Sequence, residues 1–275
     1  MRRQEDIKRL VVNADDFGLD CAINQGIIQA YESGIVRSVS LMSCGVAFEE
    51  AVQLARRYPG LGVGVHLSLN EGDPVAASLL GKDERHFLFF FRFLLKFFSR
   101  EINSAQIYLE FEAQINKFIE AGLRPTHLDG HKHIHMLPGI LDVVLELARK
   151  FKIPSIRLSR EPWLVSLKTS HRALKFLILS MIANIHLSKI RKHLIKIPDY
   201  CYGLTQSCRL NEEYLAWILK SLPVGTNELI CHPGLSTLDL PNKNKEVELI
   251  ALKSPLIKEL IEDLGIQLIR YDEIR

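Results

Sequence analysis

The sequence predicts an α/β protein with a single domain, folded as a (β/α) barrel. Short apolar or β-branched runs alternate with helical stretches along the whole chain, and no internal repeat or Gly/Ser linker divides it. Polar residues also follow several of the predicted strands. A doubly wound open sheet is the alternative, but a barrel better explains site residues at the C-terminal ends of many strands.

Length and composition support one large domain over residues 1–275. The chain is 47% hydrophobic and 24% charged, and its formal charge of +3 does not indicate a nucleic-acid partner. Its five cysteines include no C-x-x-C pair, which is typical of a reducing compartment. The N-terminal MRRQEDIKRL lacks the apolar core of a signal peptide, so we expect a cytoplasmic protein.

The predicted strands occur in series, each followed by a helical stretch. They cover residues 10–14, 38–42, 61–69, 126–129, 155–158, 228–231 and 266–270. Such alternation implies parallel strands joined by crossover helices. The clearest helix is SPLIKELIEDLG, with Ser254 as N-cap, Pro255 at its first position and Gly265 just past its end.

The first strand runs into adjacent carboxylates in VVNADDFGLD. Asp15 and Asp16 would repel each other, unless a cation binds one charge and leaves the other to handle protons. We interpret Asp16 as a metal ligand and Asp15 as a general base. Strict strand alternation points neighbours to opposite faces, so the chain must leave regular β geometry there, near Phe17 and Gly18.

Polar residues follow the later strands as well. They are His66, His127, Asp129, His131, His133, His135, Arg157 and His232. In HLDGHKHIHM the spacing of two would point every imidazole and the aspartate to one side of an extended backbone. Any one of these residues alone is more often a solvated or hydrogen-bonded group, and His133 and His135 keep that interpretation. Their coincidence at one rim favours a divalent metal on His66, His131 and an aspartate.

Six ordered motifs resemble the YdjC family, which includes chitooligosaccharide and hopanoid-biosynthesis deacetylases. They are VNADDFGLD, GVHLSL, THLDGHKHIHM, RLSREP, ELICHPG and the closing ALKSPLIKELIEDLGIQLIRY. The resemblance implies a distorted TIM-like barrel that removes acetyl groups from N-acetylated sugars, using one divalent metal ion, magnesium or zinc.

Matched residue by residue, the family's metal ligands fall on Asp16, His66 and His131, and its base falls on Asp15. By looser analogy with other carbohydrate deacetylases, His232 is the acid and Arg157 orients the base. We expect His127, Asp129 and His133 to support the ligands or to contact the substrate. The substrate would be a chitooligosaccharide or a lipid-linked N-acetylglucosamine such as a glycosylated hopanoid.

Two segments that follow site-bearing strands are predicted to form lids near residues 78–105 and 163–197. The first holds seven of the chain's 13 phenylalanines between residues 87 and 98, and the second has no Asp or Glu. They are equally consistent with packing helices, with a homo-oligomer interface, or with a basic and apolar rim in peripheral contact with the inner face of a membrane.

Two other functions stay open at this point. A metal-dependent phosphoesterase would use similar His and Asp clusters, but only three ligands are assigned, enough for one metal. A noncatalytic carbohydrate- or lipid-binding protein on the same fold need not have retained Asp15 or His232. Acetate release against phosphate release would separate these functions.

Overall fold

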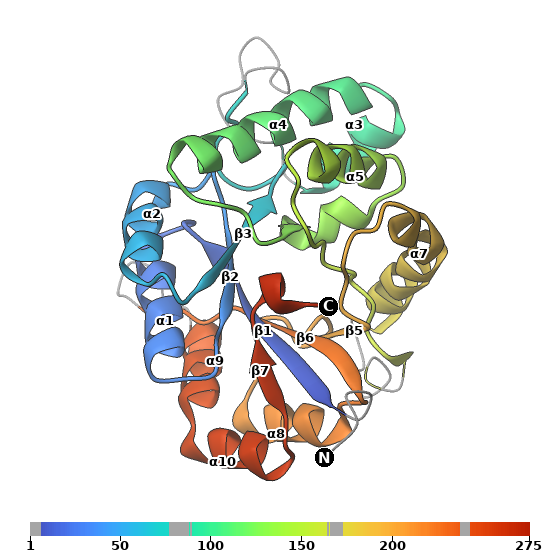
Figure 1. The fold of residues 1–275 in the computed structure, drawn as a ribbon. Coiled ribbons are helices and arrows are strands. Elements are labelled where there is room, and N and C mark those ends of the chain that lie inside the picture. Colours follow the sequence, from blue (N-terminus) through green and yellow to red (C-terminus); the bar gives the residue numbers. More distant parts are fainter. Residues whose placement is uncertain (1–6, 77–87, 89, 164, 166–172, 237–242) are drawn as a thin grey trace.

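The computed structural model describes residues 7–76, 88, 90–163, 165, 173–236 and 243–275. Its centre is a parallel sheet of seven strands in the order β4-β3-β2-β1-β6-β5, with β7 also paired to β1 (Figure 1). The strands are β1 (Lys8–Phe17), β2 (Ser38–Leu41), β3 (Gly62–Leu67), β4 (Leu128–Gly130), β5 (Tyr200–Tyr202), β6 (Gly225–Cys231) and β7 (Gln267–Ile269).

Helices follow the strands and surround the sheet (Figure 1). They are α1 (Cys21–Glu32), α2 (Phe48–Arg57), α3 (Phe90–Phe98), α4 (Ser104–Glu120), α5 (Ile140–Lys150), α7 (Ala173–Lys192), α8 (Glu212–Ser221), α9 (Lys243–Lys253) and α10 (Pro255–Asp263). Two 3-10 turns are η3 (His131–Met136) and η4 (Tyr271–Glu273). The helix predicted from Ser254 and Pro255 is confirmed, and Gly265 follows it with a positive φ of 61°.

Strand β1 is buried on both of its faces, as expected for a parallel sheet covered by crossover helices. Leu10, Val12 and Ala14 pack into the main core. Val11 points to the other face and joins a small cluster with three residues from the C-terminal end, Ile269, Tyr271 and Ile274. The end of the chain therefore fills the inside of the curled sheet (Figure 1).

The sheet curls toward closure beyond β4, which confirms the predicted distorted barrel. Ile156 forms an isolated parallel bridge with Leu128, and Ser155 forms one with Lys196, shortly before β5. Two corrections apply to the predicted strands. Among the described residues, 155–158 make only these bridges. Strand β5 was not predicted, because its sequence YCY contains none of the β-branched residues that marked the other strands.

The two predicted lid segments are described in part. Residues 78–87 and 89 of the first, and 164 and 166–172 of the second, lie outside the described residues. Within the described part, the first segment contains α3 and the start of α4, and the second contains α7.

Candidate metal and proton-transfer site

Asp15 and Asp16 end β1 where the strand loses regular geometry. The pairing of β1 with β2 shifts register between Ala14 and Phe17, and Asp16 has a φ of +67°. Such a conformation is uncommon outside glycine and costs free energy, so it persists where surrounding contacts hold it. In a regular strand, Asp15 and Asp16 would point to opposite faces of the sheet. The irregular backbone at Asp16 removes this restriction, so both carboxylates can lie at the same rim.

Asp16, His66 and His131 come together as predicted. The Asp16 Oδ1 atom lies 3.1 Å from His131 Nδ1 and 3.8 Å from His66 Nε2. One ligand atom from each of the three residues lies within 4.8 Å of the others. Two imidazoles and a carboxylate form a donor set that suits zinc or a similar divalent ion, so these residues fit the expected metal.

Asp129 holds His66 in the orientation that a metal ligand needs. Its Oδ1 atom lies 2.8 Å from His66 Nδ1, which leaves Nε2 facing Asp16. Burial disfavours the charged imidazole, but Asp129, Asp15 and Asp16 together outweigh it and raise the pKa of His66 to about 9. A cation at Nε2 would take the place of that proton.

Lys245, on α9, was missed by sequence reasoning. Its Nζ atom lies 3.1 Å from Asp16 Oδ2, on the opposite side of the carboxylate from the histidines. Burial alone would raise the pKa of Asp16, but Lys245 and then His131 hold it well below its usual range. In the sequence, NKNKE resembles an exposed polar turn, so no local signal marks Lys245.

Arg157 holds Asp15 through a bidentate contact. The guanidinium donates to both Asp15 oxygens, at 2.6 and 2.7 Å, and Asn13 Nδ2 adds a hydrogen bond of 2.9 Å. Arg157 is fully buried and also contacts Asp129 at 2.6 Å and Glu228 at 2.8 Å. A buried guanidinium with three carboxylate partners is fixed in position, so it also fixes the Asp15 carboxylate.

Ser40 connects Asp129, which orients His66, with Asn13, which contacts Asp15. Its hydroxyl donates to Asp129 Oδ2 at 2.8 Å and accepts from Asn13 Nδ2 at 2.8 Å. His127 Nε2 lies 3.0 Å from the same hydroxyl, and burial lowers the pKa of His127 to about 3. His127 therefore supports the ligands only through Ser40 and Asp129. Its ring stacks on Tyr271 of η4, with ring centroids 3.7 Å apart.

His232 directly follows β6. Its backbone N–H donates to Glu248 Oε2 at 2.5 Å, and its charge is among those that lower the pKa of Asp16. The Nδ1 atom is buried and has no hydrogen-bond partner among the described residues. An unpaired ring nitrogen at this position can exchange a proton with a ligand.

The prediction that the HLDGHKHIHM residues all point to one side was wrong. The strand ends at Gly130, and η3 follows with positive φ at Lys132 and His133. His133 Nδ1 lies 3.1 Å from Ser159 Oγ, and its ring meets Phe176 of α7. His135 is buried and its Nε2 lies 3.2 Å from the Arg157 carbonyl oxygen. Neither has a described contact with the three candidate ligands.

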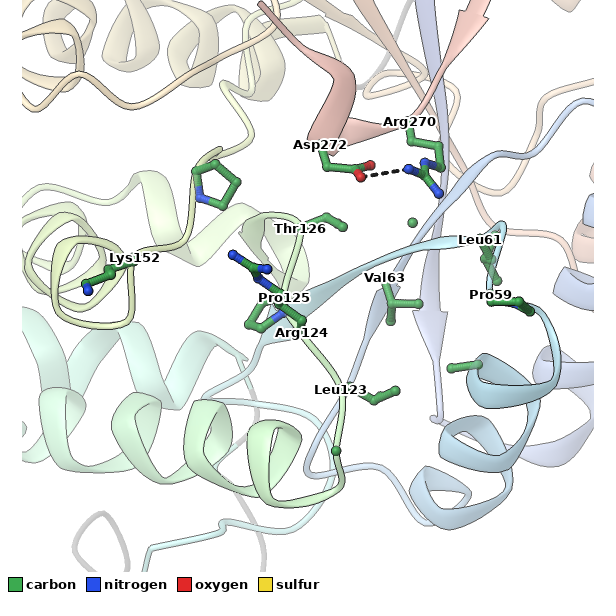
Figure 2. Close-up of a pocket in the computed structure, with 14 residues that line it drawn as sticks. Pro59, Leu61, Val63, Leu123, Arg124, Pro125, Thr126, Lys152, Arg270 and Asp272 are labelled. Carbon is green, nitrogen blue, oxygen red and sulfur yellow. Dashed lines mark hydrogen bonds and ion pairs between the residues drawn. The ribbon is translucent and has the colours of Figure 1, made fainter.

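A separate cavity of about 430 Å³ lies at the opposite end of the sheet (Figure 2). It opens between the start of β3, the loop before β4 and the region around η4, where Arg270 pairs with Asp272 at 2.8 Å. None of the candidate site residues lines it. This cavity therefore lies away from the C-terminal strand ends that carry the candidate site.

Comparison with known proteins supports the resemblance over nearly the whole chain. The chain is 32% identical to a carbohydrate deacetylase of Brevibacillus brevis, covering 97% of this chain and 99% of the relative. It is 32% identical to the mouse carbohydrate deacetylase, covering 97% and 94% of the two chains. A solved Enterococcus faecalis structure, provisionally described as a cellobiose-phosphate cleavage protein, superposes with a TM-score of 0.73 at 29% identity, covering 97% and 98% of the two chains. The model of the family described as YdjC-like protein matches residues 9–263, and the chain therefore belongs to the YdjC family.

Proposed function

We propose that this protein is a metal-dependent hydrolase that removes the N-acetyl group from an acetylated amino sugar. One observation carries the proposal. Asp16 faces two imidazoles that suit a metal, while both oxygens of its neighbour Asp15 are held by Arg157. The names of the relatives support the reaction and the class of substrate.

The donor set favours zinc or a similar ion over magnesium, although both are expected in this family. Magnesium prefers oxygen ligands, whereas two of the three candidate ligands are imidazoles. When bound, a divalent cation polarises the amide carbonyl and lowers the pKa of water.

Asp15 is suited to take a proton from the attacking water. Arg157 and Asn13 fix its carboxylate, yet two oxygens offer more lone pairs than these three contacts use. A carboxylate held in one orientation does not have to change rotamer before it accepts a proton from the water. We assign Asp15 as the general base and Arg157 as the residue that positions it.

His232 is suited to deliver a proton to the leaving amine. Water adds an oxygen to the acetyl carbon, the carbon–nitrogen bond breaks, and the sugar nitrogen leaves as an amine only when it gains a proton. The products are acetate and the free amino sugar. His232 follows β6 and is among the groups that lower the pKa of Asp16, and its Nδ1 atom has no described partner.

The geometry disfavours the phosphoesterase alternative. A second group of candidate ligands, Asp15, His66 and Asp129, shares His66 with the first. The Arg157 guanidinium already contacts the two carboxylates of this second group, Asp15 and Asp129, at 2.6–2.7 Å. A second cation there would have to displace a buried arginine, so the described residues support one metal and not the pair that two-metal phosphate chemistry uses.

The proposal is tested by measuring acetate release from a panel of N-acetylglucosaminides of increasing chain length, with one lipid-linked member. Phosphate release from p-nitrophenyl phosphate is measured in parallel with the same enzyme and metal. Acetate release that Asp15→Asn abolishes supports the proposal. Phosphate release alone would identify a phosphoesterase, and release of neither product from any substrate would favour a binding protein.

A further inference from the structure

Helix α3 carries an apolar face that its own fold leaves uncovered. Phe91, Leu95 and Phe98 are 80%, 72% and 66% exposed, and their spacing of four and three residues places them on one face. Phe93, on the other face, is buried. Isolated exposed apolar residues are common, but three large ones in a row along one helix need a partner.

Helix α7 shows the same feature over three turns. Its exposed residues Leu174, Ile178, Met181 and Ile185 share one face, at spacings of four, three and four. The opposite face packs on the core through residues that include Phe176 and Ala183, which are buried. A helix that is apolar on both faces is expected to be covered on both.

The two helices meet beside the candidate site. The Lys175 ammonium of α7 lies 5.8 Å from the centre of the Phe90 ring of α3, and Lys132 lies at the same distance from that ring. Lys132 directly follows His131, a proposed metal ligand, and the His133 ring contacts Phe176 of α7. Figure 1 shows α3 and α7 on the same side of the molecule. We call these exposed faces of α3 and α7 the α3/α7 surface.

The α3/α7 surface is positively charged, which favours an anionic partner. Arg92 is the exposed basic residue of α3, and Lys175, Arg191 and Lys192 are exposed on α7. Residues 163–197 contain no Asp or Glu. A second copy of the chain in a symmetric dimer would place these like charges against each other. An anionic lipid surface instead attracts the basic residues and accepts the apolar side chains between them.

We propose that the α3/α7 surface docks the protein onto an anionic membrane. The helices lie in the interfacial layer, with their apolar residues among the upper acyl chains and their basic residues at the headgroups. No described helix is long and apolar enough to cross a bilayer. Because η3 adjoins this surface, the candidate site would face the headgroups, and a sugar attached to a lipid could reach it. This last consequence rests on the proposed deacetylase function.

Vesicle co-sedimentation tests the docking directly. The probes are vesicles of phosphatidylcholine alone and of equal parts phosphatidylcholine and phosphatidylglycerol. We expect wild-type protein to bind only the anionic vesicles, and rising salt to weaken the binding by screening. The apolar variant Ile178→Ser/Met181→Ser and the charge variant Arg191→Glu/Lys192→Glu should each bind about tenfold more weakly or worse.

Matched controls carry the same changes away from the surface. Val247→Ser/Ile250→Ser alters exposed apolar residues of α9, and Lys152→Glu/Lys220→Glu alters two exposed lysines elsewhere. Both controls should bind like the wild type, and circular dichroism confirms that all variants fold. Absence of binding, or equal binding by all variants, would overturn the proposal. A dimer in sedimentation equilibrium that only the apolar variant dissociates would instead identify a second copy as the partner.

Acetate release from a soluble N-acetylglucosaminide separates this proposal from the proposed function. The surface variants should keep that activity, because the substituted residues have no described hydrogen bond, ion pair or ring contact with the candidate site residues. Vesicle binding without acetate release would refute the deacetylase alone. Acetate release without vesicle binding would refute the docking surface alone.

Discussion

Replacing Asp129 by asparagine should weaken the metal site without touching a proposed ligand. The carboxylate is fully buried and lies 2.8 Å from His66 Nδ1, 2.8 Å from Ser40 Oγ and 2.6 Å from Arg157 Nη1. Asparagine keeps the shape but removes the charge, and at least one of these donors then faces an amide N–H₂. His66 would lose the partner that fixes its orientation.

The expected magnitudes follow from these contacts. Two charge-assisted hydrogen bonds, to His66 and to Arg157, are each worth about 1.5–3 kcal/mol. Arg157 keeps two other carboxylates, so the free energy of unfolding should fall by about 3–5 kcal/mol, as when a buried ion pair loses one partner. Loss of the group that orients a metal-binding histidine should reduce metal affinity by about 10–100-fold.

Glu228→Gln is the matched control, because Glu228 is equally buried and contacts Arg157 Nε at 2.8 Å but has no described contact with His66. This variant should keep metal affinity while activity falls, since Arg157 then holds Asp15 less firmly.

Metal dissociation constants are measured by competition with a chromophoric chelator, and the free energy of unfolding is measured by urea denaturation of the metal-free proteins. Wild-type affinity in Asp129→Asn, or an equal loss of affinity in both variants, would refute the reasoning.

Three further predictions concern the carboxylate pair and its surroundings. Asp15→Asn should retain the metal by elemental analysis yet lose acetate release by about 10²-fold or more, as when a positioned base is removed; normal turnover would place the base elsewhere. His131→Ala should lose the metal, while its free energy of unfolding, measured in urea, falls by only about 1 kcal/mol because the side chain is partly exposed. Full metal occupancy in this variant would contradict the assignment of His131 as a ligand. Lys245→Met should remove the ammonium partner of Asp16 Oδ2 in the metal-free protein, which loses about 3–5 kcal/mol of stability and regains much of it with metal; a metal-induced rise in melting temperature no larger than in the wild type would exclude this.

Much of the candidate site could be predicted because its residues stand at the ends of parallel strands. Asp16 ends β1, His66 lies near the end of β3, and His131 directly follows β4. Parallel strands bring their C-terminal ends to one rim, so position along each strand was enough to predict that these three would meet. The break in β geometry at Asp15 and Asp16 was also predictable, because two neighbours cannot serve one face of a regular strand.

The residues that hold the ligands could not be predicted in the same way. Lys245 approaches Asp16 from a helix more than 200 residues further along the chain, with its stem against Gly234, where an added Cβ would lie 3.2 Å from its Cδ atom. Ser40 joins two parts of the network through a single hydroxyl. Neither residue type nor spacing marks such contacts, because serine and lysine are ordinary surface residues in most sequences.

The sequence by itself determined the fold class, the family and the set of residues that end the strands. These depend on the alternation of strands and helices and on local motifs, which a linear chain displays directly. The tertiary structure decided which of those residues face one another. Left-handed backbone at Lys132 and His133 turns His133 and His135 away from the ligands, and the curl of the sheet buries Arg157 among three carboxylates. Both outcomes depend on packing between distant segments, so no local pattern could have determined them.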